Sequence, residues 1–308
     1  VMSRHPMDFF HKITRTKLEL FLDRPLPDIL AQLRACKLIR SRLDCPKCNV
    51  PCREYERKAP KWPGCGWRYP RCVTTYSALK DSWFARVRLD IRPLLRMLYA
   101  FGWEQASLRS LQHELRLPDG STISKQSHTD YMSFFREICA VDNKRQPPIG
   151  GPGCVVEIDE TAFSKRKYNR GKRMAAQQWV FGGVLRGDKT KLFAVPVAKR
   201  DIDTLIPLIA RHIACGTEIH SDCWPAYNRI ETLGLKYRHL KVNHSITFKC
   251  KITGACTNTV DGVWQKLKLG HKKRFGTHRS QLTSHIDSAV FFVRYELEDR
   301  FEALLKAI

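Results

Sequence analysis

The sequence predicts an α/β protein whose second half is a strand-rich domain and whose first half is helical and rich in cysteine. Three observations lead to this prediction. Val, Ile, Phe and Trp gather in runs of strand length from residue 154 onward. Segments with helical periodicity alternate with short apolar runs after that point. A stretch rich in Pro and Gly, 143–153, precedes these runs and indicates a linker between the two halves.

The strand-rich domain begins with three predicted strands, at 155–158, 178–185 and 192–197. A turn that contains Gly187 and Asp188 joins the second strand to the third. We therefore expect the three strands to form an antiparallel meander.

Helices and strands alternate after the meander. Asp201 can cap a helix that carries Ile and Leu on one stripe and ends at Gly216. The elements expected next are a strand at 218–221, a helix from Pro225 to Gly234, a strand at 239–242 and a helix at 257–269 closed by Gly270. The order βββαβαβα is the layout of a ribonuclease H-like domain, which we expect at 154–275, with a C-terminal helix at 276–308.

The first half is expected to contain three smaller parts. Residues 1–44 favour helix and form an N-terminal helical segment. Residues 45–80 are crowded with Cys, Pro and Gly, and they cannot form a regular helix. Residues 81–142 are again helical, and we expect them to bind DNA.

Helical periodicity within 81–142 falls in three segments, at 82–101, 106–115 and 124–139. Pro118-Asp-Gly120 separates the last two, an arrangement that resembles a helix-turn-helix. The second helix of such a pair enters the major groove of DNA. The candidate groove contacts are therefore Ser124, Lys125, Gln126 and His128. Any helical hairpin shows the same pattern, so a purely structural pair is an equal alternative.

The net charge indicates the partner. The chain carries 54 Lys and Arg against 30 Asp and Glu, a formal charge of +24 at pH 7. A charge of this size favours a polyanion, with double-stranded DNA as the first expectation and an anionic membrane as the weaker one. No run of about 18 apolar residues occurs, so we expect no membrane-spanning segment and no membrane partner.

Two aspartates follow apolar strands of the expected sheet. Asp159 ends the first strand and Asp222 ends the fourth, and these strands are neighbours in the predicted layout. Carboxylates at adjacent strand ends form a hard-oxygen site for Mg²⁺ or Mn²⁺. Two such ions can grip a phosphodiester, one activating the attacking water or 3′-hydroxyl and the other stabilising the leaving oxygen. The alternative is that both aspartates are turn residues, the commoner role of a lone Asp.

The helix at 257–269 is expected to supply a third ligand. Its polar face holds Asn258, Asp261 and Lys268, opposite the apolar stripe. Asp261 is the stronger metal ligand because its carboxylate is charged, with Asn258 one turn away. Lys268 can meet a phosphate near the metals. The alternative is that this polar face is only the solvated side of the helix.

Basic residues flank these candidates in the sequence. Phosphate contacts from such residues supply affinity without reading the base sequence, and they make binding depend strongly on salt. The candidate DNA contacts are Lys165, Arg166, Lys167, Arg170, Lys172, Arg173, Lys268, Lys272, Lys273 and Arg274. His244, in the loop after the strand at 239–242, is an auxiliary candidate at the catalytic centre, although a lone His in a loop is more often structural.

Five of the twelve cysteines lie between Cys45 and Cys72, in a chain too large for a small disulfide framework. Metal ligation is the better interpretation of this cluster. The other seven cysteines are scattered among apolar or strand-like neighbours, where a reduced thiol behaves as a small hydrophobe.

Six blocks of the sequence resemble Merlin transposases and their bacterial insertion-sequence relatives, in the order of that family. The blocks are Glu157-Ile-Asp-Glu-Thr161, Lys167-Tyr-Asn-Arg-Gly171, Trp179-Val-Phe-Gly-Gly183, Ser221-Asp-Cys-Trp-Pro-Ala-Tyr227, Val242-Asn-His-Ser245 and Thr257-Asn-Thr-Val-Asp-Gly-Val-Trp264. The resemblance implies a ribonuclease H-like DDE transposase that cuts and pastes DNA at terminal inverted repeats, with Asp159 and Asp222 as its first two acids. It also implies a homodimer on DNA, because two transposon ends must be brought together, and residence in the nucleus, because the family is mainly eukaryotic.

The chain departs from the family pattern at two places. The third acid of the family is Glu, whereas Asp261 fills that position here and is one methylene shorter. The family also has an amino-terminal zinc ribbon with two cysteine pairs, which implies a degenerate ribbon at 45–80. Cys45 and Cys48 match the first pair, but Tyr69 stands where a cysteine would precede Cys72. Cys65, Cys52 or no residue then completes four-coordinate zinc.

Two other functions stay open at this point. A domesticated descendant would keep the DNA-binding surface without strand transfer, which the two departures favour. A structure-selective nuclease unrelated to transposition would cut DNA that lacks any terminal repeat.

Overall fold

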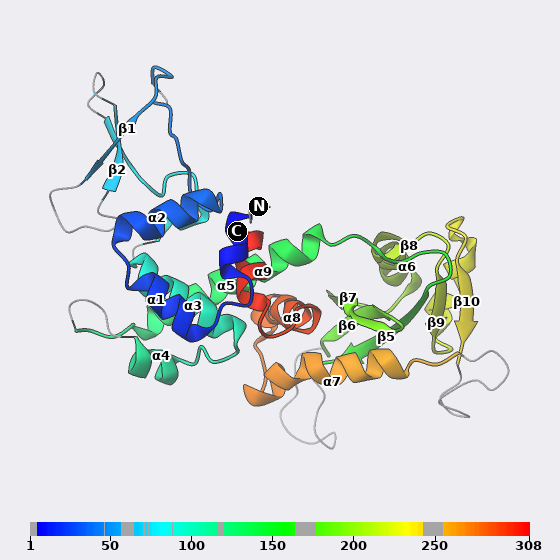
Figure 1. The fold of residues 1–308 in the computed structure, drawn as a ribbon. Coiled ribbons are helices and arrows are strands. Elements are labelled where there is room, and N and C mark those ends of the chain that lie inside the picture. The colour runs from blue at the N-terminus through cyan, green and yellow to red at the C-terminus, as the bar shows by residue number, and fades with distance from the viewer. Residues whose placement is uncertain are drawn as a thin grey trace. The chain divides into compact units, whose positions relative to one another are not determined.

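The computed structural model describes residues 5–45, 47–56, 65–69, 72, 74–87, 89–115, 120–163, 177–242 and 255–308. The chain divides into two compact units, one formed by residues 1–135 together with 297–308 and the other by residues 136–296. Helices and sheets are both present (Figure 1), which confirms the mixed α/β class. No described helix combines the length and apolar character needed to cross a membrane.

The first unit is mainly helical. Phe10 stacks edge-on against Phe21 and Phe301, with ring centroids 5.7 and 5.9 Å away, so residues from both ends of the chain share one core. Its helical elements are η1 (Pro6–Phe10), α1 (Arg15–Leu22), α2 (Leu26–Ala35), η2 (Trp83–Arg86), α3 (Ile91–Gly102), α4 (Leu108–Glu114), the first half of α5 (Lys125–Arg145) and α9 (Arg300–Ala307).

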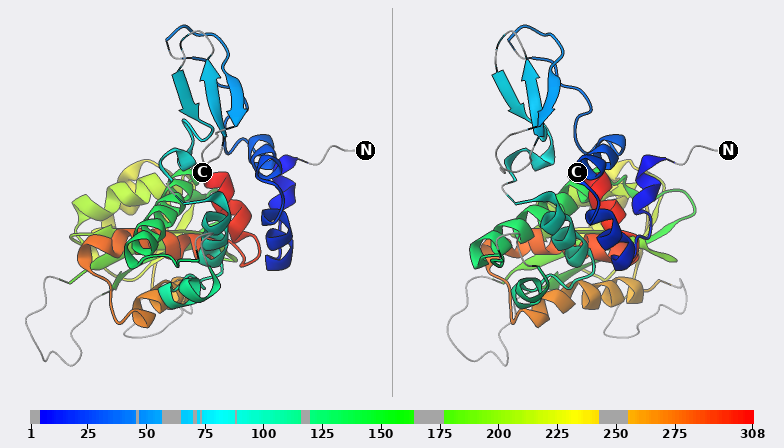
Figure 2. Two further views of the ribbon diagram at one scale, coloured as in Figure 1. Left: turned by 90° about the vertical axis from the view of Figure 1, so that its left-hand side faces the viewer. Right: turned by 60° about the vertical axis from the view of Figure 1, so that its left-hand side comes forward.

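A small antiparallel sheet also belongs to the first unit (Figure 2). Its strands β1 (Arg53–Glu56), β2 (Cys65–Tyr69) and β3 (Thr74–Ser77) pair in sequence order. Trp67 and Tyr69 are buried beneath it with Leu43, Cys45 and Cys52. The composition of this stretch had indicated only that it is not helical, whereas the family resemblance implied a degenerate zinc ribbon here.

The helix expected at 82–101 is interrupted. A short 3₁₀ turn, η2, comes first, and α3 begins only at Ile91. Asp90 has an extended backbone and accepts a hydrogen bond from Arg92 N at 2.8 Å, so it caps α3 and ends the preceding segment. The helix expected at 124–139 instead continues to Arg145, into the stretch predicted as a linker.

A five-stranded sheet forms the centre of the second unit. Its strand order is β10-β9-β5-β6-β7, with β5–β6 and β6–β7 antiparallel and β5–β9 and β9–β10 parallel. The predicted meander and the predicted neighbourhood of the first and fourth strands are therefore both present. The strands are β5 (Val155–Ala162), β6 (Trp179–Leu185), β7 (Asp188–Val197), β9 (Glu218–Ser221) and β10 (Arg238–Lys241), and a separate two-residue pair joins β4 (Ile149–Gly150) to β8 (Ile213–Ala214).

Helices cover both faces of this sheet (Figure 1). On one face, α6 (Ile202–His212) and η4 (Pro225–Leu233) pack against Ile158, Phe181 and Ile219. On the other face, α7 (Asn258–Lys273) and α8 (Arg279–Arg294) pack against Val180, Val184 and Leu192. Because side chains alternate along a strand, β6 contributes Phe181 to one core and its neighbour Val180 to the other.

Three helical predictions in this half need correction. The segment after Pro225 is a 3₁₀ helix, and α7 continues past Gly270 to Lys273. The single C-terminal helix expected at 276–308 is two helices, α8 and α9. Tyr295 adopts an extended backbone that ends α8, and Asp299 is the N-cap of α9.

Candidate active site

Asp159 lies on β5, and Asp222 follows the last residue of the neighbouring parallel strand β9. The register of β5 and β9 aligns Glu157 with His220. Asp159 and Asp222, each two residues further along, therefore lie at the same edge of the sheet. Asp159 was expected at the exit of its strand but lies inside it, since β5 continues to Ala162 and Asp159 aligns with Gly182 of β6. The antiparallel ladder with β6 fixes the Asp159 backbone more firmly than a turn would.

The Asp159 carboxylate is strongly perturbed. Trp264 of α7 donates its indole N–H to Asp159 Oδ2 at 3.0 Å. The pKa of Asp159 is raised to about 7, mainly by burial and also by the negative charges of Asp261 and Asp222, whereas the hydrogen bond from Trp264 acts to lower it. The three predicted carboxylates therefore act on one another electrostatically.

Three side chains on one face of β5 contact α7 at successive levels along the helix. Residues 157, 159 and 161 point to the same side because side chains alternate along a strand. Glu157 binds the first turn of α7, Asp159 binds Trp264 in the middle, and the Thr161 hydroxyl accepts a hydrogen bond from Lys268 Nζ. The strand that carries Asp159 therefore also fixes the helix that carries Asp261.

Glu157 makes the strongest of these attachments. Its side chain is fully buried, and its carboxylate accepts hydrogen bonds from Thr259 N at 2.7 Å and Val260 N at 3.2 Å. Arg186 Nε donates to the same carboxylate at 2.9 Å. The first N–H groups of a helix lack intrahelical acceptors, and the helix dipole favours an anion there. Glu157 thus caps α7 from the adjacent strand.

Gly182 allows Trp264 to approach Asp159. A Cβ atom at position 182 would lie 2.7 Å from Trp264 Cη2 and 2.6 Å from the carbonyl oxygen of Phe193. Neither contact is tolerable, so only glycine fits at this point of β6. Sequence reasoning missed Glu157 and Gly182 altogether and treated Trp264 only as part of an apolar stripe. The alternation of polar residues at 157, 159 and 161 was the available signal.

The remaining predicted ligands lie nearby. Asp222 is half-buried and accepts a hydrogen bond from Trp224 N at 2.9 Å, whereas Asn258 and Asp261 are exposed in the first turn of α7. Among the described residues, the three aspartates do not have oxygens that all lie within 4.8 Å of one another. Lys268, expected to meet a phosphate near the metals, is half-buried, with Nζ 5.7 Å from the Phe163 ring centroid.

Residues 149–288 match the family model of the ISXO2-like transposase domain. This match supports a DDE transposase family for that part of the chain, and it covers the five-stranded sheet together with α6 and α7. A comparison with curated proteins gave no match. Asp159, Asp222 and Asp261 all fall inside the transposase domain.

Several predicted contacts of the transposase domain lie outside the described residues. These are His244 and the cluster Lys165, Arg166, Lys167, Arg170, Lys172 and Arg173. The other basic cluster is described. Lys272, Lys273 and Arg274 are exposed at the C-terminal end of α7, where cations are favoured by the helix dipole.

The predicted groove contacts precede the transposase domain, at the start of α5. Lys125 and Gln126 are exposed, and Gln126 Nε2 donates to Asp130 Oδ1 at 2.8 Å. Ser124 accepts a hydrogen bond from Ser127 N, and His128 Nε2 lies 2.8 Å from the Ala106 carbonyl oxygen. Ser124 and His128 therefore have structural roles.

A cluster of thiols also precedes the transposase domain. The sulfur atoms of Cys45, Cys48 and Cys72 all lie within 4.8 Å of one another, and the Cys48 and Cys72 sulfurs are 3.6 Å apart. Tetrahedral zinc with Zn–S bonds of about 2.3 Å separates its ligands by about 3.8 Å, so this donor set fits zinc. Cys52 is buried in the adjacent core, Tyr69 packs there as an apolar residue, and the Cys65 side chain is outside the described atoms.

Proposed function

We propose that this protein is a DNA transposase of the Merlin type, which cuts and pastes DNA that ends in terminal inverted repeats. The observation that carries the proposal is geometric: Asp159 on β5 lies beside the end of β9, where Asp222 follows, and Trp264 of α7, the helix that carries Asp261, is hydrogen-bonded to Asp159. The strand order, with an antiparallel second strand and parallel fourth and fifth strands, supports the ribonuclease H-like arrangement that we propose. The match to a DDE transposase domain agrees with this chemistry.

The three carboxylates suit a pair of Mg²⁺ or Mn²⁺ ions. They are hard oxygen donors, and their mutual repulsion is relieved when a divalent cation binds. When bound, such a pair supplies an activated nucleophilic oxygen and stabilises the leaving oxygen of the phosphodiester. Asp159 is held for this task by Trp264, and α7 presents Asp261 with Asn258 one turn away. Lys268 would orient a phosphate oxygen from the same helix, and His244 is an auxiliary residue in this proposal.

The other parts of the chain would bind and arrange the DNA. We assign phosphate contacts to Lys272, Lys273 and Arg274 and to the basic cluster between residues 165 and 173, with groove contacts from Lys125 and Gln126. Cys45, Cys48 and Cys72 would hold structural zinc in a degenerate ribbon. The active form would be a homodimer on DNA in the nucleus.

We also propose the C-terminal segment 280–308 as a contact between the two protomers. Within this segment, α8 buries Leu282, Ile286 and Val290 in the core of its own unit. Its exposed side is therefore the only part of α8 that a second protomer can reach.

The test is cleavage of labelled DNA that carries candidate terminal repeats, in Mg²⁺ or Mn²⁺. We expect the wild type to cut at the repeat end, and Asp159→Asn, Asp222→Asn and Asp261→Asn to lose at least about 100-fold in rate, as expected when a group needed for charge stabilisation is removed. Asp188→Asn is the matched control, because Asp188 lies at the start of β7, at the hairpin turn. It should cut like the wild type.

Other outcomes would replace the proposal. Specific binding without cleavage in either metal would identify a domesticated descendant, which the shorter Asp261 side chain favours. Equal cleavage of DNA with and without repeats would identify a structure-selective nuclease. A light-scattering mass of one protomer per DNA in the cleavage-competent complex would exclude the dimer.

A further inference from the structure

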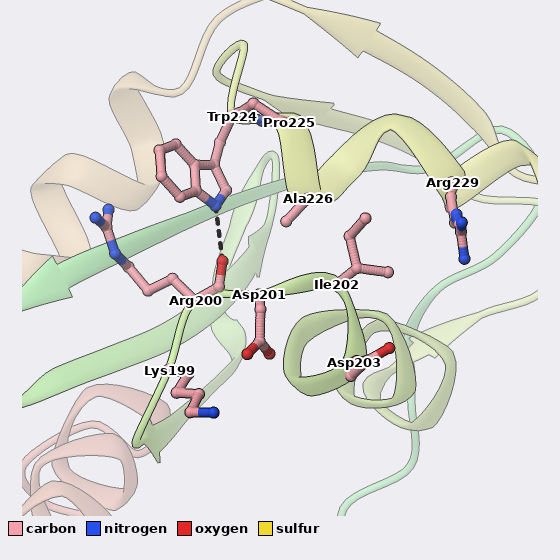
Figure 3. A pocket seen from close by; sticks show the side chains of 9 residues that line it. All are labelled: Lys199, Arg200, Asp201, Ile202, Asp203, Trp224, Pro225, Ala226 and Arg229. Atoms are coloured by element: carbon pink, nitrogen blue, oxygen red, sulfur yellow. Dashed lines mark hydrogen bonds between the residues drawn. The ribbon is translucent and has the colours of Figure 1, made fainter.

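Arg200 lies just beyond β7 and is stacked on two indole rings. Its guanidinium carbon lies 3.7 Å from the centroid of Trp179 and 4.6 Å from that of Trp224. Trp224 also donates its indole N–H to the Arg200 carbonyl oxygen at 2.8 Å (Figure 3). Both the backbone and the charged group of this arginine are therefore held in place.

The stack lies at the same sheet edge as the candidate active site. Trp179 opens β6 opposite Ala162, the last residue of β5, and Trp224 N donates to the Asp222 carboxylate. The positive charge of Arg200 also acts on Glu160, the residue after Asp159. Arg200 is thus a fixed cation beside the carboxylates.

Arg200 has no ion-pair partner among the described carboxylates. A half-buried guanidinium offers five N–H donors in a plane, and a contact with an indole ring does not use these donors as a hydrogen bond to a carboxylate would. The edge is the part that binds a phosphate, through two parallel hydrogen bonds. This arginine is therefore suited to an anion that none of the described residues supplies.

A cavity of about 790 Å³ opens beside Arg200 (Figure 3). Its volume falls in the range of sites for ligands the size of a nucleotide. Its charged lining comprises Lys199, Arg200 and Arg229 with Asp201 and Asp203, and Ile202, Trp224, Pro225 and Ala226 complete the wall. The Asp201 carboxylate is already engaged by Thr204 N at the start of α6, which leaves the cations as the larger unengaged set.

We propose that Arg200 binds a backbone phosphate of the DNA strand in the active site, and that the adjoining cavity receives the nucleotide attached to it. This assignment rests on the proposed function, since it takes DNA as the substrate. Trp179 and Trp224 position the guanidinium, and Lys199 and Arg229 add charge at the cavity. The contact reads no base, so it supplies affinity and alignment rather than sequence specificity.

The test measures binding of a fluorescein-labelled 30-base-pair duplex with a single-stranded 3′ overhang, at several salt concentrations in Ca²⁺. We expect Arg200→Ala to weaken binding about tenfold and to reduce the slope of log K against log salt by about 1, the value for one lost phosphate contact. Lys189→Ala is the matched control, because it removes one exposed cation at the turn between β6 and β7, away from Trp179. Its slope should equal that of the wild type.

A second variant covers the case in which Arg200→Ala disturbs the fold. Arg200→Lys keeps the charge but loses the planar fork, so it should keep the salt slope and bind several-fold more weakly. Wild-type affinity in Arg200→Lys, or a wild-type slope in a folded Arg200→Ala protein, would overturn the assignment.

The cleavage assay separates the two proposals. Binding that depends on Arg200 in a protein that does not cut repeat-ended DNA would retain the phosphate site and reject transposition. Repeat-specific cleavage by a protein whose Arg200→Ala variant binds with the wild-type salt slope would support transposition and reject the phosphate site at Arg200.

Discussion

Asp159 illustrates how a functional residue is placed by its neighbours. Strand pairing fixes its backbone opposite Gly182, the absence of a side chain there admits Trp264, and Trp264 holds one carboxylate oxygen. The residue is left with negative charges from Asp222 and Asp261 close by. In a protein without a bound divalent ion, such a carboxylate retains its proton to an unusually high pH.

This raised pKa predicts a pH-dependent stability. The folded state binds the Asp159 proton more tightly than the unfolded state, so its contribution is complete below about pH 4. It is lost as the pH rises towards the folded pKa of about 7. In urea titrations without divalent ions, the wild type should lose on the order of 2 kcal/mol more than Asp159→Asn between pH 5 and pH 8.

A control isolates the effect. The pKa of Asp188 is lowered by its hydrogen bond from Thr190, so Asp188→Asn should change nothing between pH 5 and pH 8. Identical pH profiles for the wild type and Asp159→Asn would show that the carboxylate is not protonated in the folded state.

For individual residues, the sequence pattern nominated the candidate acids but not the residues that hold them and α7 in place. Asp159 and Asp222 follow apolar runs, and helical spacing selects Asp261, so local pattern suffices to nominate them. Glu157 and Gly182 matter because of Thr259 and Trp264, which come about 80 to 100 residues later. Such contacts exist only after the sheet and α7 have packed, and the alternation of polar residues at 157, 159 and 161 is the one local signal of them.

Among the elements, α7 depends most on a single side chain elsewhere. Thr257 is its N-cap but makes no side-chain capping hydrogen bond, and Glu157 accepts from two N–H groups of the first turn instead. The same carboxylate is paired with Arg186. Removing one partner of a buried ion pair is more destabilising than losing an exposed pair.

Glu157→Gln should therefore destabilise the protein by about 3 kcal/mol, because the amide keeps the shape but loses the charge that Arg186 and the α7 N-terminus require. Urea unfolding monitored by tryptophan fluorescence measures this. Glu296→Gln changes an exposed carboxylate of the same unit and should stay within about 0.5 kcal/mol of the wild type. Equal unfolding midpoints for the wild type and Glu157→Gln would contradict the anchoring role.

Element prediction succeeded for most of the second unit. Its strands and helices follow the predicted order, although β9 and β10 are only four residues long and carry few apolar residues. β1, β2 and β3 were not predicted because they are four or five residues long in a stretch dominated by Cys, Pro and Gly. Their formation depends on packing around Trp67 and Tyr69 rather than on local preference.

For the molecule as a whole, the thiol cluster and the net charge of +24 are the features that composition foretold. The charge favours a polyanionic partner, and the thiols gather although they lie up to 27 positions apart in sequence, from Cys45 to Cys72. A three-stranded sheet with so small a core gains stability when a metal joins its loops.

The full chain, purified under reducing conditions, should carry about one zinc ion per molecule, as four-coordinate thiolate sites do. Cys48→Ser should lose most of it, because serine replaces a thiolate that lies 3.6 Å from Cys72. Inductively coupled plasma mass spectrometry gives the stoichiometry of zinc.

Cys215→Ser is the control, because it alters an exposed thiol of the second unit, and it should retain the metal. Comparing the zinc content of Cys52→Ser with that of Cys65→Ser identifies the fourth ligand. A zinc-free wild type would rule the site out.

The three attachments between β5 and α7 have a geometric consequence. Two residues of a strand advance about 6.6 Å, and four residues of a helix advance about 6 Å. The attachments step by two along β5, through Glu157, Asp159 and Thr161, and by about four along α7, from Val260 through Trp264 to Lys268. The two repeats are nearly commensurate, so each strand residue meets a helix residue at its own level. A side chain in α7 can therefore be exchanged, but its residue count between Val260 and Lys268 cannot, since one insertion would rotate every later position by about 100°.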